Sequence, residues 1–182
     1  MRTIARHAKV SQATLHHYFG HKEALYESCV AAMDAEARTL YESFLTEAPE
    51  TGGAAAVVEG ALRRALALGR QHKPALRLVM RVMIDEGELD ERRRRDSLLP
   101  FLAIGEALLT EVSGLPTRRL RLVLHSLNLL VVRYALNSEA ELREIVGKDG
   151  EQLSTVEVEA AVADHLVATA HALLGLGLGR GG

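Results

Sequence analysis

The chain has 182 residues, of which 48% are hydrophobic and 25% are charged, with no tryptophan and four prolines. This length and balance exclude a peptide or a disordered tail and favour a helical protein with a sizeable core. The single cysteine, Cys29, cannot close an intrachain disulfide, no leader resembles a secretory signal, and no apolar stretch is long enough to span a bilayer. We therefore expect a cytoplasmic protein with no membrane partner.

The charge is unevenly distributed, although the formal net charge is only −2. The first 26 residues carry four Lys and Arg side chains against Glu23 alone, and they hold four of the eight histidines. The segment 139–164 is strongly acidic. A basic N-terminal segment in a chain with an acidic C-terminal part predicts that this segment contacts phosphates locally, and not that the whole protein binds nucleic acid nonspecifically.

Apolar residues recur at helical spacing along the chain, and no alternating β-branched run indicates a strand, so we predict an all-α fold. Pro74 and Pro116 lie at expected helix starts, whereas Pro100 predicts a kink or a break inside its helix. The predicted helices span residues 2–8, 12–19, 22–45, 54–72, 74–85, 91–112, 117–137, 139–146 and 155–174.

The breakers Pro49, Gly52 and Gly53 divide the predicted helices into a small head and a larger body. We predict a helix-turn-helix head with a connecting helix at residues 1–45, and an effector-binding and dimerisation domain at residues 46–174. Residues 175–182 are expected to form a flexible glycine-rich tail. The tail is not a phosphate loop, because a helix precedes it and none follows.

The head has the layout of two short helices joined by a tight turn. We expect the chain to turn at Lys9 and Val10, with Ser11 capping the second helix by accepting a backbone N–H. The apolar side chains of the head should form a miniature core: Ile4, Ala5, Ala8, Val10, Leu15 and Phe19. The outer face of the second helix then carries Gln12, Ala13, His16 and His17, in the geometry by which a helix enters a major groove.

These positions resemble the DNA-binding region of the TetR family of transcriptional regulators. The matching motifs are Ile4-Ala5, Val10-Ser11, Thr14-Leu15, Tyr18-Phe19 and Lys22-Glu23-Ala24-Leu25. The resemblance covers residues 1–45 by motif; beyond them only length and helix count agree. It implies a ligand-responsive repressor that binds a palindromic double-stranded DNA operator as a homodimer and is released by a small-molecule effector.

The resemblance also implies which side chains meet DNA. Gln12, Ala13 and His17 are expected to face bases. The expected phosphate contacts are Thr3, His16, Tyr18 and Lys22, and Thr14 completes the predicted DNA-binding set.

The chain departs from the family pattern in three places. His16 stands where the family commonly has tyrosine. Lys9 stands where the family usually has glycine, and a positive φ there would cost on the order of 1 kcal/mol. Family members carry a further helix before this one, so we expect the first helix of the DNA-binding domain to be missing.

The helices at 117–137 and 155–174 are apolar around much of their circumference, which matches the family's use of two long C-terminal helices for dimerisation. The predicted dimer interface comprises Leu120, Leu124, Leu127, Val131, Val158, Val162, His165, Leu166 and Thr169.

An effector pocket is expected to be lined by apolar side chains with a few polar ones, although the same pattern is also that of a plain core. The candidate effector-binding residues are Tyr41, Phe44, Met80, Met83, Ile84, Phe101, Ile104, Leu108, His125 and Asn128.

No nucleophile elbow, zinc helix, P-loop or paired-carboxylate motif occurs, so we expect no enzyme and no cofactor. The four N-terminal histidines point in different directions on their helices and predict no metal site. The run 92–95, Arg-Arg-Arg-Arg, follows acidic residues and indicates a solvated helix start rather than a second nucleic-acid patch. The alternative function is a helical dimeric interaction protein that has lost DNA binding.

Overall fold

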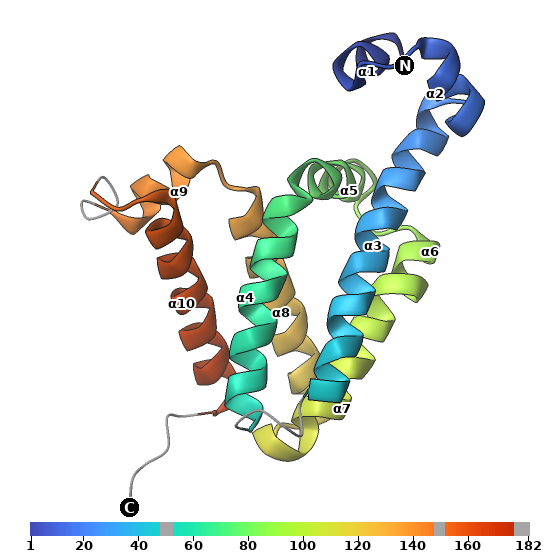
Figure 1. The fold of residues 1–182 in the computed structure, drawn as a ribbon. Coiled ribbons are helices and arrows are strands. Elements are labelled where there is room, and N and C mark those ends of the chain that lie inside the picture. The colour runs from blue at the N-terminus through green and yellow to red at the C-terminus, as the bar shows by residue number, and fades with distance from the viewer. Residues whose placement is uncertain (48–52, 148–151, 177–182) are drawn as a thin grey trace, which may run out of the picture.

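The computed structural model describes residues 1–47, 53–147 and 152–176, and every regular element in these ranges is a helix. The predicted all-α fold class is confirmed. A small head, formed by α1 (Arg2–Ala8) and α2 (Gln12–Phe19), stands at the beginning of the long helix α3 (Lys22–Glu47) and projects from the helical body (Figure 1).

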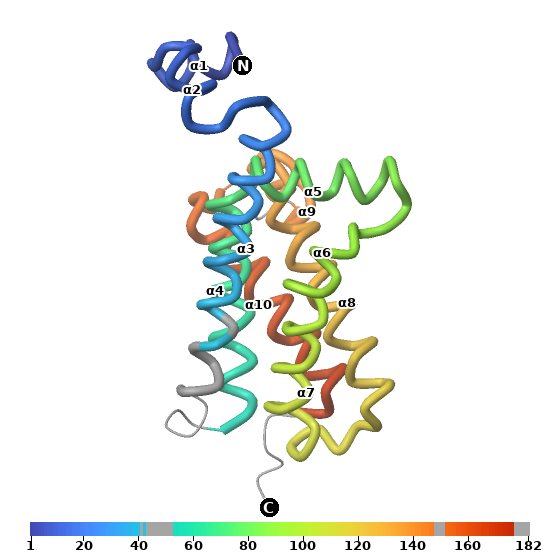
Figure 2. Tube along the Cα trace, turned by 90° about the vertical axis from the view of Figure 1, so that its right-hand side faces the viewer, coloured from blue at the N-terminus to red at the C-terminus, as the bar shows by residue number. Residues whose placement is uncertain are grey.

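The body consists of the remaining helices. They are α4 (Ala54–Gln71), α5 (Lys73–Glu86), α6 (Glu91–Arg93), the π-helical turn η1 (Arg94–Leu98), α7 (Leu99–Ser113), α8 (Thr117–Leu136), α9 (Glu139–Val146) and α10 (Thr155–Leu174). α4 and α8 pack together at the centre, with α10 on one side and α3 and α7 on the other. Figure 2 shows α3 running alongside α4, and α7 alongside α8.

The core of the body lies where the apolar faces of α4, α7, α8 and α10 meet. Leu120 of α8 and Leu166 and Leu174 of α10 are fully buried there. Burying each of these side chains contributes roughly 1.5–3 kcal/mol. The packing of these four helices therefore holds the body together.

Local signals in the chain explain where several helices begin and end. Ser138 and Ser154 each accept a hydrogen bond from the backbone N–H three residues later, that of Glu141 and Glu157 respectively. The two glutamates accept the serine N–H in return, at 2.7 Å in both cases. These two capping boxes start α9 and α10. At the other end of α10, Gly175 adopts φ 69° and ends the helix.

The helix expected at 91–112 is divided into α6, η1 and α7, which agrees with the break predicted from Pro100. Proline has no N–H to donate to the carbonyl four residues earlier, which is that of Asp96. The Arg38 Nη2 atom of α3 donates to this carbonyl instead, at 2.8 Å. The break thus creates a polar link between α3 and η1.

Among the described residues, no single helix is long and apolar enough to cross a membrane. The segments Glu91–Ser113 and Thr117–Leu136 reach that length and composition only together, and they are bent by 118° where they join.

Candidate DNA-binding surface and ligand cavity

The turn between α1 and α2 has the geometry that its sequence predicts. Ser11 Oγ accepts the backbone N–H of Thr14 at 2.9 Å, so the predicted N-cap is confirmed. Lys9 adopts φ 56° and ψ 36°, the left-handed region that a side chain disfavours. The Val10 N–H donates to the Ala5 carbonyl at 3.0 Å and closes the end of α1.

The miniature core of the head is smaller than expected. Ala5 and Leu15 are buried and Phe19 is partly buried, whereas Ile4 is 38% exposed and Val10 is 42% exposed. Ala8 is exposed as well. The physical reason is that α1 packs chiefly on α2, and two short helices cover only one face of each other.

The outer face of α2 is formed by side chains opposite Leu15. Ala13 and His17 lie at its centre, and the Tyr18 ring beside them is 74% exposed and meets the His17 ring edge-on at 5.3 Å between centroids. Gln12 and His16 form the other flank.

Hydrogen bonds order part of this face. Gln12 Nε2 lies 3.2 Å from His16 Nε2, and His16 Nδ1–H donates to the Gly20 carbonyl at 2.6 Å. Thr3 and Lys22 are exposed as well, but Thr14 is half-buried, with its hydroxyl 2.7 Å from Ser11 Oγ. Seven of the eight predicted DNA-binding side chains are therefore accessible, and Thr14 is engaged in the cap.

The strained backbone at Lys9 leads to a stability prediction. Replacing Lys9 by glycine is expected to stabilise the head by about 1 kcal/mol, because glycine adopts positive φ without a Cβ clash. Hydrogen exchange should then show about fivefold stronger protection of the α1 and α2 amides. Lys9→Ala is the matched control, since it removes the charge and keeps the Cβ. An equal gain in both variants would assign the effect to charge and not to the backbone.

A capped helix-turn-helix whose second helix presents an open face on a basic segment defines a DNA-binding protein. Residues 1–29 match the family model described as bacterial regulatory proteins, tetR family, and the matched segment covers α1, α2 and the beginning of α3. The N-terminal segment of the chain is therefore a DNA-binding domain of the TetR type. No protein with curated annotation and no solved structure matches the chain.

The histidines of the head have separate partners. His7 Nδ1–H donates to the Thr3 carbonyl at 2.8 Å, and His21 Nδ1 accepts the Ala24 N–H at 3.2 Å at the start of α3. In the described part of the chain, no group of three or more His, Cys, Asp or Glu side chains could hold a metal ion.

A cavity of about 320 Å³ lies in the body between α3, α4, α5, η1, α7 and α8. This volume is at the lower end of the roughly 300–1,000 Å³ that is typical of small-molecule sites. Six of the predicted effector-binding residues line it: Met80, Met83, Phe101, Ile104, His125 and Asn128. A second cavity of about 110 Å³ adjoins it, shares Phe101, Ile104 and Asn128 with it, and is also lined by Leu108.

Of the remaining effector candidates, only Ile84 has a described side chain, and it lines neither cavity. Ile84 is 74% exposed, so its assignment to the pocket is wrong: it lies on the solvent-facing side of α5. The side chains of Tyr41 and Phe44 lie outside the described residues.

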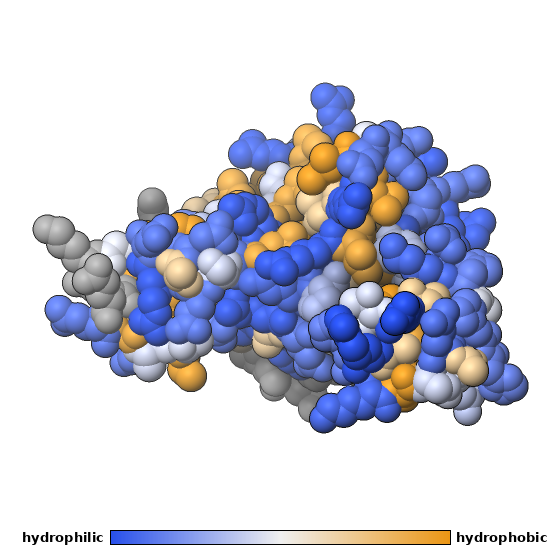
Figure 3. All heavy atoms as spheres, turned by 90° about the horizontal axis from the view of Figure 1, so that it is seen from above, coloured by the Kyte–Doolittle hydropathy of each residue, from blue (hydrophilic) through white to orange (hydrophobic). Residues whose placement is uncertain are grey.

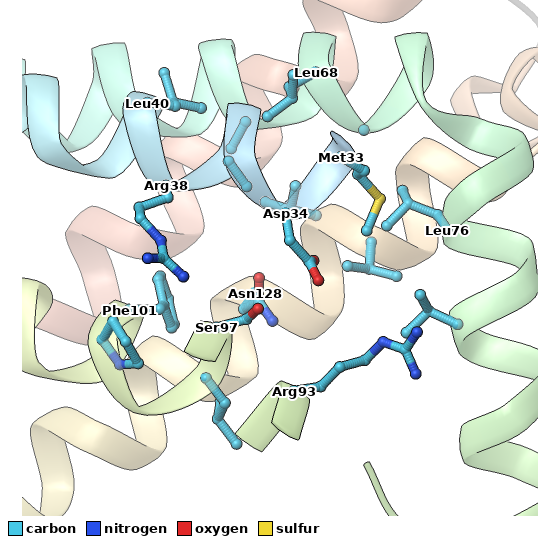
Figure 4. A pocket seen from close by; sticks show the side chains of 18 of the residues that line it. Met33, Asp34, Arg38, Leu40, Leu68, Leu76, Arg93, Ser97, Phe101 and Asn128 are labelled. Atoms are coloured by element: carbon cyan, nitrogen blue, oxygen red, sulfur yellow. The ribbon is translucent and has the colours of Figure 1, made fainter. Parts of the chain in front are cut away.

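Four charged residues of the first cavity were not predicted from the sequence. Asp34 and Arg38 come from α3, Arg93 from α6 and Asp96 from η1. Figure 4 shows the Asp34 side chain directed from α3 into the cavity. The sequence does show two charged residues one helical turn apart in α3. The same spacing is found on solvent-exposed helix faces, so it did not identify these residues as cavity-lining.

Arg93 corrects the interpretation of the arginine run as wholly solvated. Its three neighbours in the run are exposed, but the Arg93 side chain is only 10% exposed. Its guanidinium pairs with Asp90, lies 3.4 Å from Glu27 Oε2 through Nη2, and lies 5.6 Å from the Tyr26 ring centroid. A buried charge is tolerated where carboxylates and an aromatic face compensate it, so Arg93 ties α6 to the beginning of α3.

The structure also corrects the residues chosen for the dimer interface. Seven of the nine are buried inside one protomer and cannot reach a partner without repacking: Leu120, Leu124, Leu127, Val131, Val158, Val162 and Leu166. Of the other two, His165 is exposed and meets the Tyr134 ring edge-on at 5.9 Å, and Thr169 is half-buried. The reason is that α4 and α7 cover the most apolar face of α8, and α4 and α8 cover that of α10, within the same chain.

Proposed function

We propose that the chain is a ligand-responsive repressor of the TetR family that acts in the cytoplasm, binds a palindromic operator as a homodimer and is released by a small-molecule effector. The observation that carries the proposal is the open face of α2, with Ala13 and His17 at its centre, inside the segment that matches the family. Regulators of this family act by binding DNA, and we propose no catalytic activity and no cofactor for the chain.

The DNA-binding part is tested by separating base contacts from phosphate contacts. His17→Ala is expected to change operator preference, because His17 lies at the centre of the face that enters the groove. Lys22→Ala is expected to weaken binding to all sequences and to lower the slope of log K against log salt by about 0.9. Binding to a randomised operator library at several salt concentrations measures both effects.

The outcome that contradicts this division is an equal loss of affinity for every operator in both variants. Absence of any mobility shift on upstream DNA would favour the alternative, a helical dimeric interaction protein. One observation favours that alternative: apolar side chains of the head, Ile4 and Val10, are exposed. Seen from above, hydrophobic patches interrupt a largely hydrophilic surface (Figure 3).

For the dimer, we propose an interface on the outer face of α10 and the adjoining face of α8. On α10 this face carries small side chains at helical spacing, Ala161, Ala168 and Ala172, next to His165. On α8 the exposed Leu122 adds apolar surface. Small residues let two helices approach closely, and a two-fold pairing of the body would place two heads for two operator half-sites.

This interface predicts that Ala168→Arg raises the dissociation constant of the dimer at least tenfold, about 1.4 kcal/mol, because an arginine side chain holds the two helices apart. Sedimentation velocity over a concentration series measures the change. Ala67→Arg, on the exposed face of α4, is the control. A dimer that tolerates Ala168→Arg as well as Ala67→Arg would place the interface elsewhere.

For the effector, we propose the 320 Å³ cavity as the binding site. Its wall includes Asp34 and Arg38 of α3, and the same helix begins next to the DNA-binding helix α2. Arg38 donates to the Asp96 carbonyl, and Arg93 contacts Glu27, so two polar links join the cavity wall to α3. A ligand that shifts these contacts would move α3 and thereby change the orientation of the head.

A further inference from the structure

The effector cavity holds the carboxylate of Asp34, which has a hydrogen-bond partner but no paired cation among the described residues. It is half-buried in α3 and directed into the cavity (Figure 4). Its side chain accepts a hydrogen bond from the Ser97 hydroxyl, and within the described ranges Arg93 and Arg38 act on it through space without forming a salt bridge. A buried carboxylate without a paired cation is costly unless a partner arrives from outside.

The two nearest arginines are engaged elsewhere. Arg93 pairs with Asp90 and lies 3.4 Å from Glu27. Arg38 donates to the Asp96 carbonyl at 2.8 Å. Both lower the pKa of Asp34 through space, but burial is the larger effect and raises that pKa above its ordinary value. The negative charge of Asp34 is therefore incompletely compensated by its surroundings.

The rest of the cavity indicates what kind of molecule would supply the missing charge. Among the described residues, its charged lining has three carboxylates, those of Asp34, Glu42 and Asp96, against the two arginines Arg38 and Arg93. Asp96 already lies 3.0 Å from the Arg95 Nε atom and Glu42 is exposed, so Asp34 is the half-buried carboxylate that remains without a paired cation among the described residues. An anion would meet this excess of negative charge, whereas a cation would reduce it.

The remaining lining is apolar and adaptable. Met33, Met80 and Met83 contribute flexible thioether side chains, and leucines, valines and Phe101 complete the walls. Phe101 and Ile104 also line the second cavity, which is apolar and adjoins the first. The space available to a ligand therefore has one charged position, and the rest of its lining is apolar.

We infer that the effector is an amphipathic monocation, a protonated amine on an apolar body, whose ammonium group pairs with Asp34 while its apolar part lies along the methionines toward Phe101. This inference rests on the proposed effector function of the same cavity. It names the chemical class that the cavity selects. Asp34 is the residue that distinguishes a cation from a neutral or an anionic ligand of the same shape.

Three probes of equal chain length test the inference on the full chain by isothermal titration calorimetry at neutral pH, without DNA. They are 4-phenylbutylamine, which is protonated, 4-phenylbutanol, which is neutral, and 4-phenylbutyrate, which is anionic. The amine is expected to bind at least tenfold more tightly than the alcohol, and the alcohol more tightly than the carboxylate. Asp34→Asn, which keeps the size of the side chain and removes its charge, is expected to abolish the preference for the amine over the alcohol.

Asp85→Asn is the matched control, because Asp85 is exposed at the end of α5 and outside the cavity. It should retain the preference for the amine, and circular dichroism and thermal melting should show that both variants fold. Because removal of a buried unpaired charge is not expected to destabilise the chain, Asp34→Asn should melt no lower than the unmodified protein.

Equal binding of the amine and the alcohol, failure of the amine to bind, or an unchanged preference in Asp34→Asn would each overturn the inference. The proposed function fails separately. If the amine binds through Asp34 but the affinity for operator DNA stays the same with the cavity saturated, the cation site stands and the effector role does not.

Discussion

Replacing Leu166 by alanine is expected to lower the free energy of unfolding by about 2–5 kcal/mol. Leu166 is fully buried in α10, where it belongs to the core that α10 forms with α4 and α8. Truncation removes apolar contacts and leaves a cavity that closely packed helices fill only partly. Equilibrium unfolding in urea, monitored by circular dichroism, measures the change at a fixed protein concentration.

Val156→Ala provides the control on the same helix. Val156 is 76% exposed, so its truncation should change the free energy of unfolding by no more than about 0.5 kcal/mol. If the two variants unfold at the same urea concentration, α10 is not packed in the way described. A loss confined to Leu166→Ala supports the assignment of this face of α10 to the core of one protomer and not to a dimer interface.

Replacing Gly69 by alanine is expected to destabilise the protein by about 1–3 kcal/mol, although alanine is the better helix former. A Cβ at position 69 of α4 would lie 2.8 Å from the Cβ of Ala135 in α8, and 3.3 Å from Leu76 Cδ1. The Ala135 Cβ is fixed to its backbone and fully buried, so α4 and α8 would have to move apart. Thermal or urea unfolding measures the effect.

The same substitution in the same helix supplies a control of opposite sign. At Gly60 an added Cβ would meet only the end of the Arg64 side chain, at 3.3 Å, and a flexible side chain can move. Gly60→Ala should therefore be neutral or stabilise the chain by up to about 1 kcal/mol through helix propensity. Equal destabilisation by both changes would show that helix geometry, and not the contact between α4 and α8, limits position 69.

The helices and the DNA-binding motif were predictable because their signals are local. Ser11 caps α2 through a hydrogen bond to a residue three positions away, and the effect of Pro100 on the chain around it depends on its missing N–H. The open face of α2 also follows from the helical spacing of Leu15 and His17, because residues a half-turn apart lie on opposite faces. The capping serines of α9 and α10 belong to the same class of signal.

The assignment of surfaces was less predictable, because helical spacing tells which side chains share a face but not what covers that face. Leu120 and Leu166 lie on the apolar faces expected to form a dimer interface, yet α4 and α7 cover the face of α8, and α4 and α8 cover that of α10, within one chain. Ile84 has the composition of a pocket residue but lies on the solvent side of α5. The sequence predicts Arg93 to be one of four solvated arginines, but in the structure its guanidinium contacts Asp90, Glu27 and Tyr26.

By itself, the sequence determined that this protein is all-helical, where most of its helices begin and end, and that its first residues form a helix-turn-helix of the TetR family. Those features depend on side-chain spacing, caps and breakers within a few residues of each other. Only the tertiary structure decided that Asp34 enters a cavity and that the most apolar faces of α8 and α10 are turned inward. Both outcomes depend on contacts between helices that are far apart in the chain. Many pairings of similar apolar faces are compatible with the same local sequence pattern, and close packing of side chains selects one of these pairings.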